Sequence, residues 1–512
     1  MRNPVLILAS LLTVLFPLLA PTPAAAAGAR AITWAPCAED TTAECGTLTV
    51  PVDWKNPRGE TFELAVARRE ATDPSARIGS LVINPGGPGG SGVTAVLQGG
   101  AFSPELTRRF DLVGFDPRGV ARSHPIQCSM DLFRQAPDPF SIDGRADFEA
   151  LLAHNERYRQ DCRARTGPLF DHVDTGSVVR DLDALRAALG DDKLTYYGIS
   201  YGTLIGQLYA ERFPERVRAL TLDSNMDHSL GTRAFLDTES WTVQDSFDEF
   251  VAWCDRTESC ALHGADVRAR WAGLLARAER GELTFPGEPD QKLTKIGLIS
   301  QAFGAFYGPA FKELAEFLAA LDSGEPARAI LTPLAAQAQD VLHDPTQIFC
   351  QDYLLPVRDH REYARHLRRS AAIAPDMLVS VLAQGMVATC LGQPAPIPNP
   401  QHRLRVHGTP TLLLGNSLHD PATAYPWAVS TARQIGREAR LLTYEGWGHG
   451  IYGQGECPTA AIDAYLISGA LPAEGARCPA VAPADAGTLR SRLQPPTGPL
   501  PGLPGYTYNL TG

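Results

Sequence analysis

The chain has 512 residues, and its 57 Asp and Glu against 46 Lys and Arg give a formal net charge of −11. An acidic chain without basic clusters argues against a nucleic acid as its partner. The length exceeds that of one simple domain and suits a core domain that carries a large insertion.

Residues 1–27 have the pattern of an export signal. A basic Arg2 precedes an apolar run over residues 5–20, and small residues follow up to Ala27. The alternative is a membrane anchor, but the run is shorter than the ~20 apolar residues that a spanning helix needs. We therefore expect cleavage near Ala26 or Ala27 and a secreted protein without later membrane contact. The scarcity of lysine beside abundant Ala, Gly and Pro favours a GC-rich bacterial genome.

Residues 28–235 alternate strand and helix patterns, which predicts an α/β fold with a mostly parallel sheet covered on both faces. Short apolar runs indicate four buried strands, at residues 80–84, 111–115, 193–197 and 217–223. Before the third run, residues 177–189 repeat apolar side chains at helical spacing, which predicts a helix.

A glycine-rich loop, residues 84–92, follows the first of these strands. Such loops can cradle phosphates, but no Gly-Lys-Ser or Gly-Lys-Thr follows here. A flexible linker is the other simple interpretation. If a serine nucleophile lies nearby, a loop without side chains would instead let backbone N–H groups face a developing oxyanion.

The sequence Gly198-Ile199-Ser200-Tyr201-Gly202 lies between the third strand and a helical pattern over residues 203–210. A strand that turns sharply into a helix holds its serine on a strained hinge, and bulky residues two positions away would collide with that turn. The five residues alone also arise by chance in a chain with 46 glycines. In this context they predict Ser200 as the nucleophile of a hydrolase, with the N–H groups of Gly87 and Tyr201 as its oxyanion hole.

Residues 236–400 have a different pattern. Amphipathic helices are expected at residues 241–254, 267–280, 296–307 and 311–321, and no comparable series of strands occurs. We predict a helical cap inserted into the sheet domain; the alternative is more of the core, with weaker strands. Residues 394–400 contain four prolines, so they cannot be helical and suit a linker out of the cap.

The sheet pattern resumes in residues 401–480, which we predict to be the second part of the core. Strands are expected at residues 411–415 and 439–444. The last segment, residues 481–512, is rich in proline and glycine and is predicted to be a poorly ordered tail.

Two residues that follow these last strands complete a possible catalytic triad. A serine hydroxyl needs a histidine to take its proton, and the histidine needs a carboxylate to hold it. In sheet hydrolases the order along the chain is serine, acid, histidine. Asp420 follows the first strand and His449 the second, so Ser200, Asp420 and His449 have this order. His419 precedes the acid and Asp223 lies before the cap, which makes both weaker candidates.

The ten cysteines all lie after the export signal, and an even number in an exported protein favours disulfides. Connectivity cannot be deduced from sequence alone. We predict pairing between neighbours: Cys37 with Cys45, Cys128 with Cys162, Cys254 with Cys260, Cys350 with Cys390 and Cys457 with Cys478. Buried free thiols or a metal site are the alternatives, but no Cys-x-x-Cys or paired-histidine spacing supports a metal. We expect neither a metal nor another cofactor.

Together these motifs resemble the secreted tripeptidyl aminopeptidase family of the α/β-hydrolases, which are relatives of prolyl aminopeptidase. The resemblance rests on segments across most of the mature chain, residues 86–92, 116–119, 198–202, 348–352, 420–423 and 448–450. It implies an exported serine exopeptidase that releases short peptides, often tripeptides, from a free N terminus. Ala121 departs from the family pattern, which usually has glycine there, in a loop that we expect to be structural.

An aminopeptidase must bind a positively charged amino terminus, and a buried carboxylate of the cap would supply charge-assisted hydrogen bonds. Asp352 is the candidate, because a disulfide at Cys350 would fix its position; a surface acid or a helix cap is the alternative. We expect a monomer that acts on peptides. A carboxylesterase with the same triad is the second candidate function, and an inactive binding protein on the same scaffold is the third.

Overall fold

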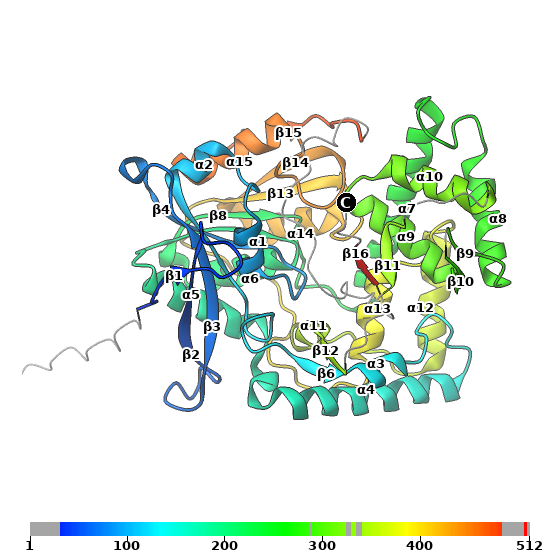
Figure 1. The fold of residues 1–512 in the computed structure, drawn as a ribbon, viewed down its shortest axis with the longest axis horizontal. Helices are drawn as coiled ribbons and strands as arrows, with labels where there is room; N and C mark the ends of the chain where they lie inside the picture. The colour runs from blue at the N-terminus through cyan, green and yellow to red at the C-terminus, as the bar shows by residue number, and fades with distance from the viewer. Residues whose placement is uncertain (1–30, 287, 324–328, 334–339, 484–505, 509–512) are drawn as a thin grey trace, which may run out of the picture.

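The computed structural model describes residues 31–286, 288–323, 329–333, 340–483 and 506–508 (Figure 1). Its centre is a ten-stranded sheet in the order β1-β2-β3-β5-β4-β7-β8-β13-β14-β15. Strands β5 to β15 of this order pair in parallel, whereas β1, β2 and β3 form an antiparallel edge. The predicted mostly parallel sheet is confirmed. The strands are β1 (Ala35–Pro36), β2 (Glu44–Pro51), β3 (Thr61–Arg69), β4 (Gly79–Asn84), β5 (Phe110–Phe115), β7 (Leu194–Ile199), β8 (Val217–Asp223), β13 (Leu412–His419), β14 (Ala439–Trp447) and β15 (Arg477–Cys478).

Helices cover both faces of this sheet, which is why its central strands are apolar on both sides. Every residue of β4, β5 and β7 is buried. Val82 packs into the apolar cluster formed with α5 (Thr175–Ala188), α6 (Tyr201–Arg212) and α14 (Tyr425–Ile435). Its neighbour Leu81 points to the other cluster, with α1 (Gly92–Gln98), α2 (Pro104–Arg109) and α15 (Glu456–Ser468).

Between β8 and β13 the chain is mainly helical and has an apolar core of its own, with Phe250, Trp271 and Leu298 among its members. Figure 1 shows this segment on the opposite side of the molecule from the β1–β3 edge. Its helices are α7 (Thr232–Arg256), α8 (Val267–Glu279), α9 (Lys295–Tyr307), α10 (Phe311–Ser323), α11 (Thr346–Asp352), α12 (His360–Ile373) and α13 (Val381–Cys390). Below we call residues 232–390 the inserted segment.

Short strands also occur in the inserted segment, where the sequence indicated none. They are β9 (Thr284–Phe285), β10 (Glu288–Lys292), β11 (Leu331–Pro333) and β12 (Val341–His343). β12 pairs with β6 (Gln127–Ser129) of the first part of the chain. Together with α3 (Met130–Arg134) and the long α4 (Arg145–Thr166), this pairing ties the inserted segment to the sheet domain.

Five disulfides join the ten cysteines in the pairs expected from the sequence, Cys37–Cys45, Cys128–Cys162, Cys254–Cys260, Cys350–Cys390 and Cys457–Cys478. The predicted export signal, residues 1–27, lies outside the described residues, as does most of the predicted tail. The tail was expected to be poorly ordered; of its residues the structure describes 481–483 and β16 (Tyr506–Tyr508), and β16 pairs antiparallel with β11.

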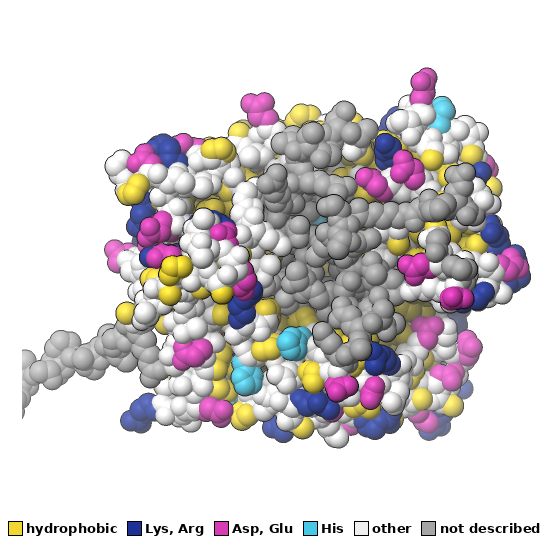
Figure 2. All heavy atoms as spheres, in the orientation of Figure 1, with side chains coloured by type: hydrophobic (Ala, Val, Ile, Leu, Met, Phe, Trp, Pro, Cys, Tyr) yellow, Lys and Arg dark blue, Asp and Glu magenta, His cyan; other side chains and the backbone are white. Residues whose placement is uncertain are grey.

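On the face shown in Figure 2, Lys and Arg side chains are interspersed with Asp and Glu. Within the described ranges, no helix is both long enough and apolar enough to cross a membrane.

Candidate active site

Ser200 occupies the turn between β7 and α6 with a strained backbone, at φ 59° and ψ −125°. Few non-glycine residues adopt this region, and strain of this kind gathers at functional sites. A Cβ atom on Gly198 would lie 2.5 Å from the carbonyl oxygen of Gly202, and one on Gly202 would lie 2.7 Å from that of Asn84. Both glycines are therefore required by the packing of the turn, as the sequence predicted.

His449 and Asp420 meet at the same end of the sheet, because each follows the end of a strand that runs parallel to β7. Both oxygens of the Asp420 carboxylate lie 3.0 Å from His449 Nδ1. The carboxylate is fully buried and also accepts hydrogen bonds from the backbone N–H groups of Ala422 and Thr423 and from the Thr423 hydroxyl. These donors hold the carboxylate in the orientation that fixes the histidine tautomer.

The other ring nitrogen of His449, Nε2, is buried and has no hydrogen-bond partner among the described residues. The side chain of Ser200 instead shares a hydrogen bond with the hydroxyl of Tyr307, at the end of α9. The Tyr307 ring lies beside the His449 ring, with 4.5 Å between ring centroids. The backbone carbonyl of Tyr307 also accepts a hydrogen bond from the backbone N–H of His449. Burial raises the pKa of Tyr307, so the phenol stays protonated. The inserted segment thus contacts both the serine and the histidine.

The glycine-rich loop after β4 lies directly against the serine turn. A Cβ atom on Gly86 would lie 2.4 Å from the carbonyl oxygen of Ile199 and 3.0 Å from the backbone nitrogen of Tyr201. Gly87, Ser200 and Tyr201 line one cavity together. The structure therefore places the residues of the two predicted oxyanion donors and the predicted nucleophile around the same cavity.

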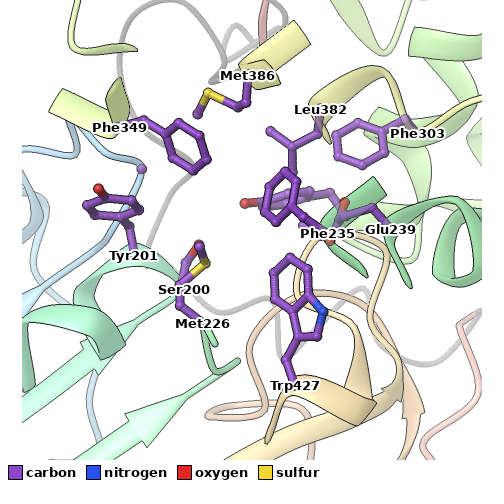
Figure 3. A pocket seen from close by; sticks show the side chains of 13 residues that line it. Ser200, Tyr201, Met226, Phe235, Glu239, Phe303, Phe349, Leu382, Met386 and Trp427 are labelled. Carbon is purple, nitrogen blue, oxygen red and sulfur yellow. The ribbon is translucent and has the colours of Figure 1, made fainter. Parts of the chain in front are cut away.

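This cavity is bounded on one side by the serine turn and on the other by the inserted segment (Figure 3). Most of the side chains around it are apolar, with Phe235, Leu382, Met386 and Trp427 among them. Glu239 of α7 is the acidic residue of the lining and lies across the cavity from Ser200. A charged group in such a wall is unusual unless it has a partner.

Glu239 is fully buried and only half satisfied. Its Oε2 accepts a hydrogen bond from the Ser380 hydroxyl at 3.1 Å, while its Oε1 has no partner within the described part of the chain. Burial, with a smaller contribution from the negative charge of Asp420, raises the pKa of Glu239 well above its usual range. Sequence reasoning missed this residue, because the helical pattern recognised there began only at Trp241.

Asp352 is not part of the cavity lining. Its carboxylate is fully buried near Tyr201, the first residue of α6. It accepts four hydrogen bonds, two from Thr175 and one each from Tyr201 and Asn399. The structure therefore does not bring Asp352 to the position from which it would contact a substrate amine beside Ser200.

Thr423 is the last residue of the 420–423 segment, and the sequence analysis assigned it no role. Its hydroxyl donates to Asp420 Oδ2 at 2.8 Å and lies 3.4 Å from His449 Nδ1. We expect Thr423→Val to lower kcat/KM by about tenfold, because a hydrogen bond to a charged group contributes ~1.5–3 kcal/mol and two backbone donors remain on Asp420. Thr423→Ser keeps the hydroxyl and should keep the activity. An equal loss in the two variants would contradict this role.

A buried serine on a strand-to-helix turn, a histidine bound to a carboxylate and a glycine loop beside them define a serine hydrolase of the α/β class. Residues 79–294 match the family described as alpha/beta hydrolase fold, and residues 376–478 match the family described as TAP-like protein. The chain belongs to the α/β-hydrolase family, in the group that carries this TAP-like segment.

Three relatives share most of their length with this chain. Serine protease Hip1 of Mycobacterium tuberculosis is 35% identical over 482 residues, which cover 87% of this chain and 91% of that protein. Tripeptidyl aminopeptidase of Streptomyces lividans is 32% identical over 488 residues, covering 89% and 88%. Carboxylesterase B of Mycobacterium tuberculosis is 33% identical over 490 residues, covering 89% and 92%. With the fold and the site, these similarities identify the protein as a serine hydrolase.

Proposed function

We propose that the protein is an exported, monomeric aminopeptidase of bacterial origin that releases short peptides, tripeptides foremost, from free N termini. The five disulfides suit an oxidising compartment outside the cytoplasm. The relatives named serine protease and tripeptidyl aminopeptidase support a peptide substrate. The observation that carries the preference for a free N terminus is that Glu239 Oε1, across the cavity from Ser200, has no hydrogen-bond partner among the residues that the structure describes.

In the proposed reaction, Ser200 Oγ attacks the scissile carbonyl while His449 Nε2 takes its proton. Asp420 stabilises the imidazolium that forms. The N–H groups of Gly87 and Tyr201 donate to the oxyanion of the tetrahedral intermediate. His449 then gives the proton to the leaving amine, and an acyl-enzyme on Ser200 remains. A water molecule, activated by the same histidine, hydrolyses this ester and frees the short peptide.

A substrate ammonium group suits Glu239 on electrostatic grounds. An uncompensated carboxylate in this apolar wall is costly, which is the reason for its raised pKa. A cation beside it favours the ionised form again, and the charge-assisted hydrogen bond that results is stronger than a neutral one. Because Glu239 and Ser200 lie on opposite sides of the cavity, the distance between them would limit how many residues fit before the scissile bond.

The test compares a chromogenic tripeptide with a free N terminus, its N-acetyl form and a short-chain ester. We expect the wild type to cleave the free tripeptide in preference to the blocked one. Glu239→Gln removes the charge but keeps the shape and the Ser380 contact, so kcat/KM on the free tripeptide should fall by about 10- to 100-fold, the size of one or two charge-assisted hydrogen bonds. Cleavage of the N-acetyl form should change little.

Asp237→Asn is the matched control, since Asp237 lies on the same helix but pairs with Arg233 and Arg369 at the surface. It should behave as the wild type. Equal cleavage of free and blocked peptides, with no effect of Glu239→Gln on their ratio, would refute recognition of the N terminus.

The second candidate is a carboxylesterase. The apolar lining of the cavity, with Phe235, Phe303 and Met386, favours it, and one of the relatives bears that name. Cleavage of the ester without cleavage of either peptide would establish this candidate instead.

A further inference from the structure

Asp352 is the last residue of α11, and α11 lies where the inserted segment contacts the sheet domain. Its neighbours Ile348, Phe349 and Cys350 belong to the apolar cluster of the sheet, not to the core of the inserted segment. The Cys350–Cys390 disulfide also joins α11 to α13. The helix that carries Asp352 is therefore held both by packing against the sheet domain and by the disulfide to α13.

The carboxylate joins three separate parts of the chain. One oxygen, Oδ1, accepts from the Thr175 backbone N–H at 2.9 Å and from Asn399 Nδ2 at 2.6 Å. The other, Oδ2, accepts from the Thr175 hydroxyl at 2.6 Å and from the Tyr201 hydroxyl at 2.5 Å. Thr175 begins α5, Tyr201 begins α6, and Asn399 lies in the proline-rich linker towards β13.

Four donors on two oxygens suit an ionised carboxylate, which accepts hydrogen bonds and donates none. Burial raises the pKa of Asp352 to about 7, with a smaller contribution from the charge of Asp174, which caps the start of α5, while the hydrogen bonds from Thr175, Tyr201 and Asn399 act in the opposite direction. A ring nitrogen of His228 contacts the Asp352 backbone carbonyl. A carboxylate with all its acceptor positions filled has no position left for a substrate.

Tyr201 connects this carboxylate to the reaction. It directly follows Ser200, and its N–H is one of the two proposed oxyanion donors. Its side chain is buried, held by Asp352 at the hydroxyl and packed near Phe349, with 6.4 Å between ring centroids. Because Ser200 has strained dihedral angles, the peptide plane between Ser200 and Tyr201 needs support from outside the turn.

We infer that Asp352 is a positioning residue, which holds the Tyr201 side chain and thereby aims the Tyr201 N–H at the developing oxyanion. The inference rests on the proposed hydrolytic mechanism at Ser200, but not on recognition of a free N terminus. It assigns Asp352 a role other than the amine contact expected from the sequence. Misplacing such a donor by about 1 Å can cost on the order of 100-fold in rate.

The experiment uses the full-length mature enzyme and two variants, Asp352→Asn and Tyr201→Phe. Asp352→Asn removes the charge at constant shape, and Tyr201→Phe removes only the hydroxyl. We expect each to lower kcat by 10- to 100-fold, to change KM less than about threefold, and to slow the labelling of Ser200 by a fluorophosphonate probe by a similar factor. The kcat of the double variant should be little lower than that of the less active single variant, because both changes remove the same contact.

Asp174→Asn is the matched control. Asp174 lies beside Asp352 at the start of α5, but it caps that helix through Ser177 and does not contact Tyr201. The Asp174→Asn variant should keep the kcat of the wild type even if its melting temperature is lower. Thermal unfolding of every variant separates loss of fold from loss of rate, and Tyr201→Phe alone tests the inference if Asp352→Asn does not fold.

Three results would overturn the inference. In the first, both variants unfold at lower temperature but keep kcat, and the contact is then only structural. In the second, Asp352→Asn keeps kcat but loses the preference for free over N-acetyl peptides, and the residue then binds the substrate amine. In the third, the effects of the two single changes add. If the wild type cleaves esters alone, the proposed peptidase activity fails while the same variants still test the positioning role on the ester.

Discussion

Ser200→Ala should lower kcat on the tripeptide substrate by about 10⁵- to 10⁶-fold. The change removes the attacking oxygen, and only binding and the oxyanion donors remain to accelerate attack by water. Steady-state kinetics on protein purified in parallel, with active-site titration by a fluorophosphonate probe, measures the effect. The variant should take up no probe.

Ser417→Ala is the control for this result. Ser417 is also buried near the end of a strand of the same sheet, and its hydroxyl has no hydrogen-bond partner in the described chain. Its removal should leave both kcat and probe uptake unchanged. Residual peptidase activity of Ser200→Ala above about a thousandth of wild type, in a preparation free of contaminating peptidase, would rule out Ser200 as nucleophile.

Asp420→Asn should reduce kcat by about 10⁴-fold with little change in structure. The amide nitrogen of asparagine would meet His449 Nδ1, which favours the wrong tautomer and removes the charge that stabilises the imidazolium. Measurement of kcat/KM from pH 6 to 10 would follow the effect, and circular dichroism would check the fold.

The comparison variant is Asp223→Asn, because Asp223 was the rival acid. Asp223 accepts from the Tyr197 hydroxyl and from the backbone N–H groups of Ile451 and Tyr452, so it supports the loop that follows His449. Its substitution should cost stability more than catalysis. If Asp223→Asn were the less active of the two while remaining folded, the assignment of Asp420 as the triad acid would be wrong.

The sheet, and the places of Ser200, Asp420 and His449 on loops that follow its strands, could be predicted from sequence because their signals are local. The buried strand before Ser200 was expected at residues 193–197 and is found at Leu194–Ile199. Asp420 and His449 each follow a strand, and these two strands were expected to bring both residues to the edge of Ser200 if they ran parallel to the strand before it. Parallel pairing of β13 with β8 and β14 brings them there.

Other features depend on contacts that no local pattern contains. The proposed role of Glu239 follows only from its place in the cavity, across from Ser200. Asp352 lies 151 residues from Tyr201 along the chain and 177 from Thr175, so its partners could not be inferred from its neighbours. The helix α4 was not predicted either, because its charged residues obscure the apolar spacing. The strands of the β1–β3 edge were not predicted, because polar and charged residues interrupt the apolar runs of β2 and β3.

Each of the three loops that carry the proposed catalytic residues contacts the inserted segment. The Thr242 hydroxyl donates to the Asp420 carbonyl, the His449 N–H donates to the Tyr307 carbonyl, and the Tyr201 hydroxyl donates to Asp352. The segment is consequently not an exchangeable module that sets specificity on a self-sufficient catalytic base. A chimera that takes this segment from one relative and the sheet domain from another would have to match these contacts before it could turn over any substrate.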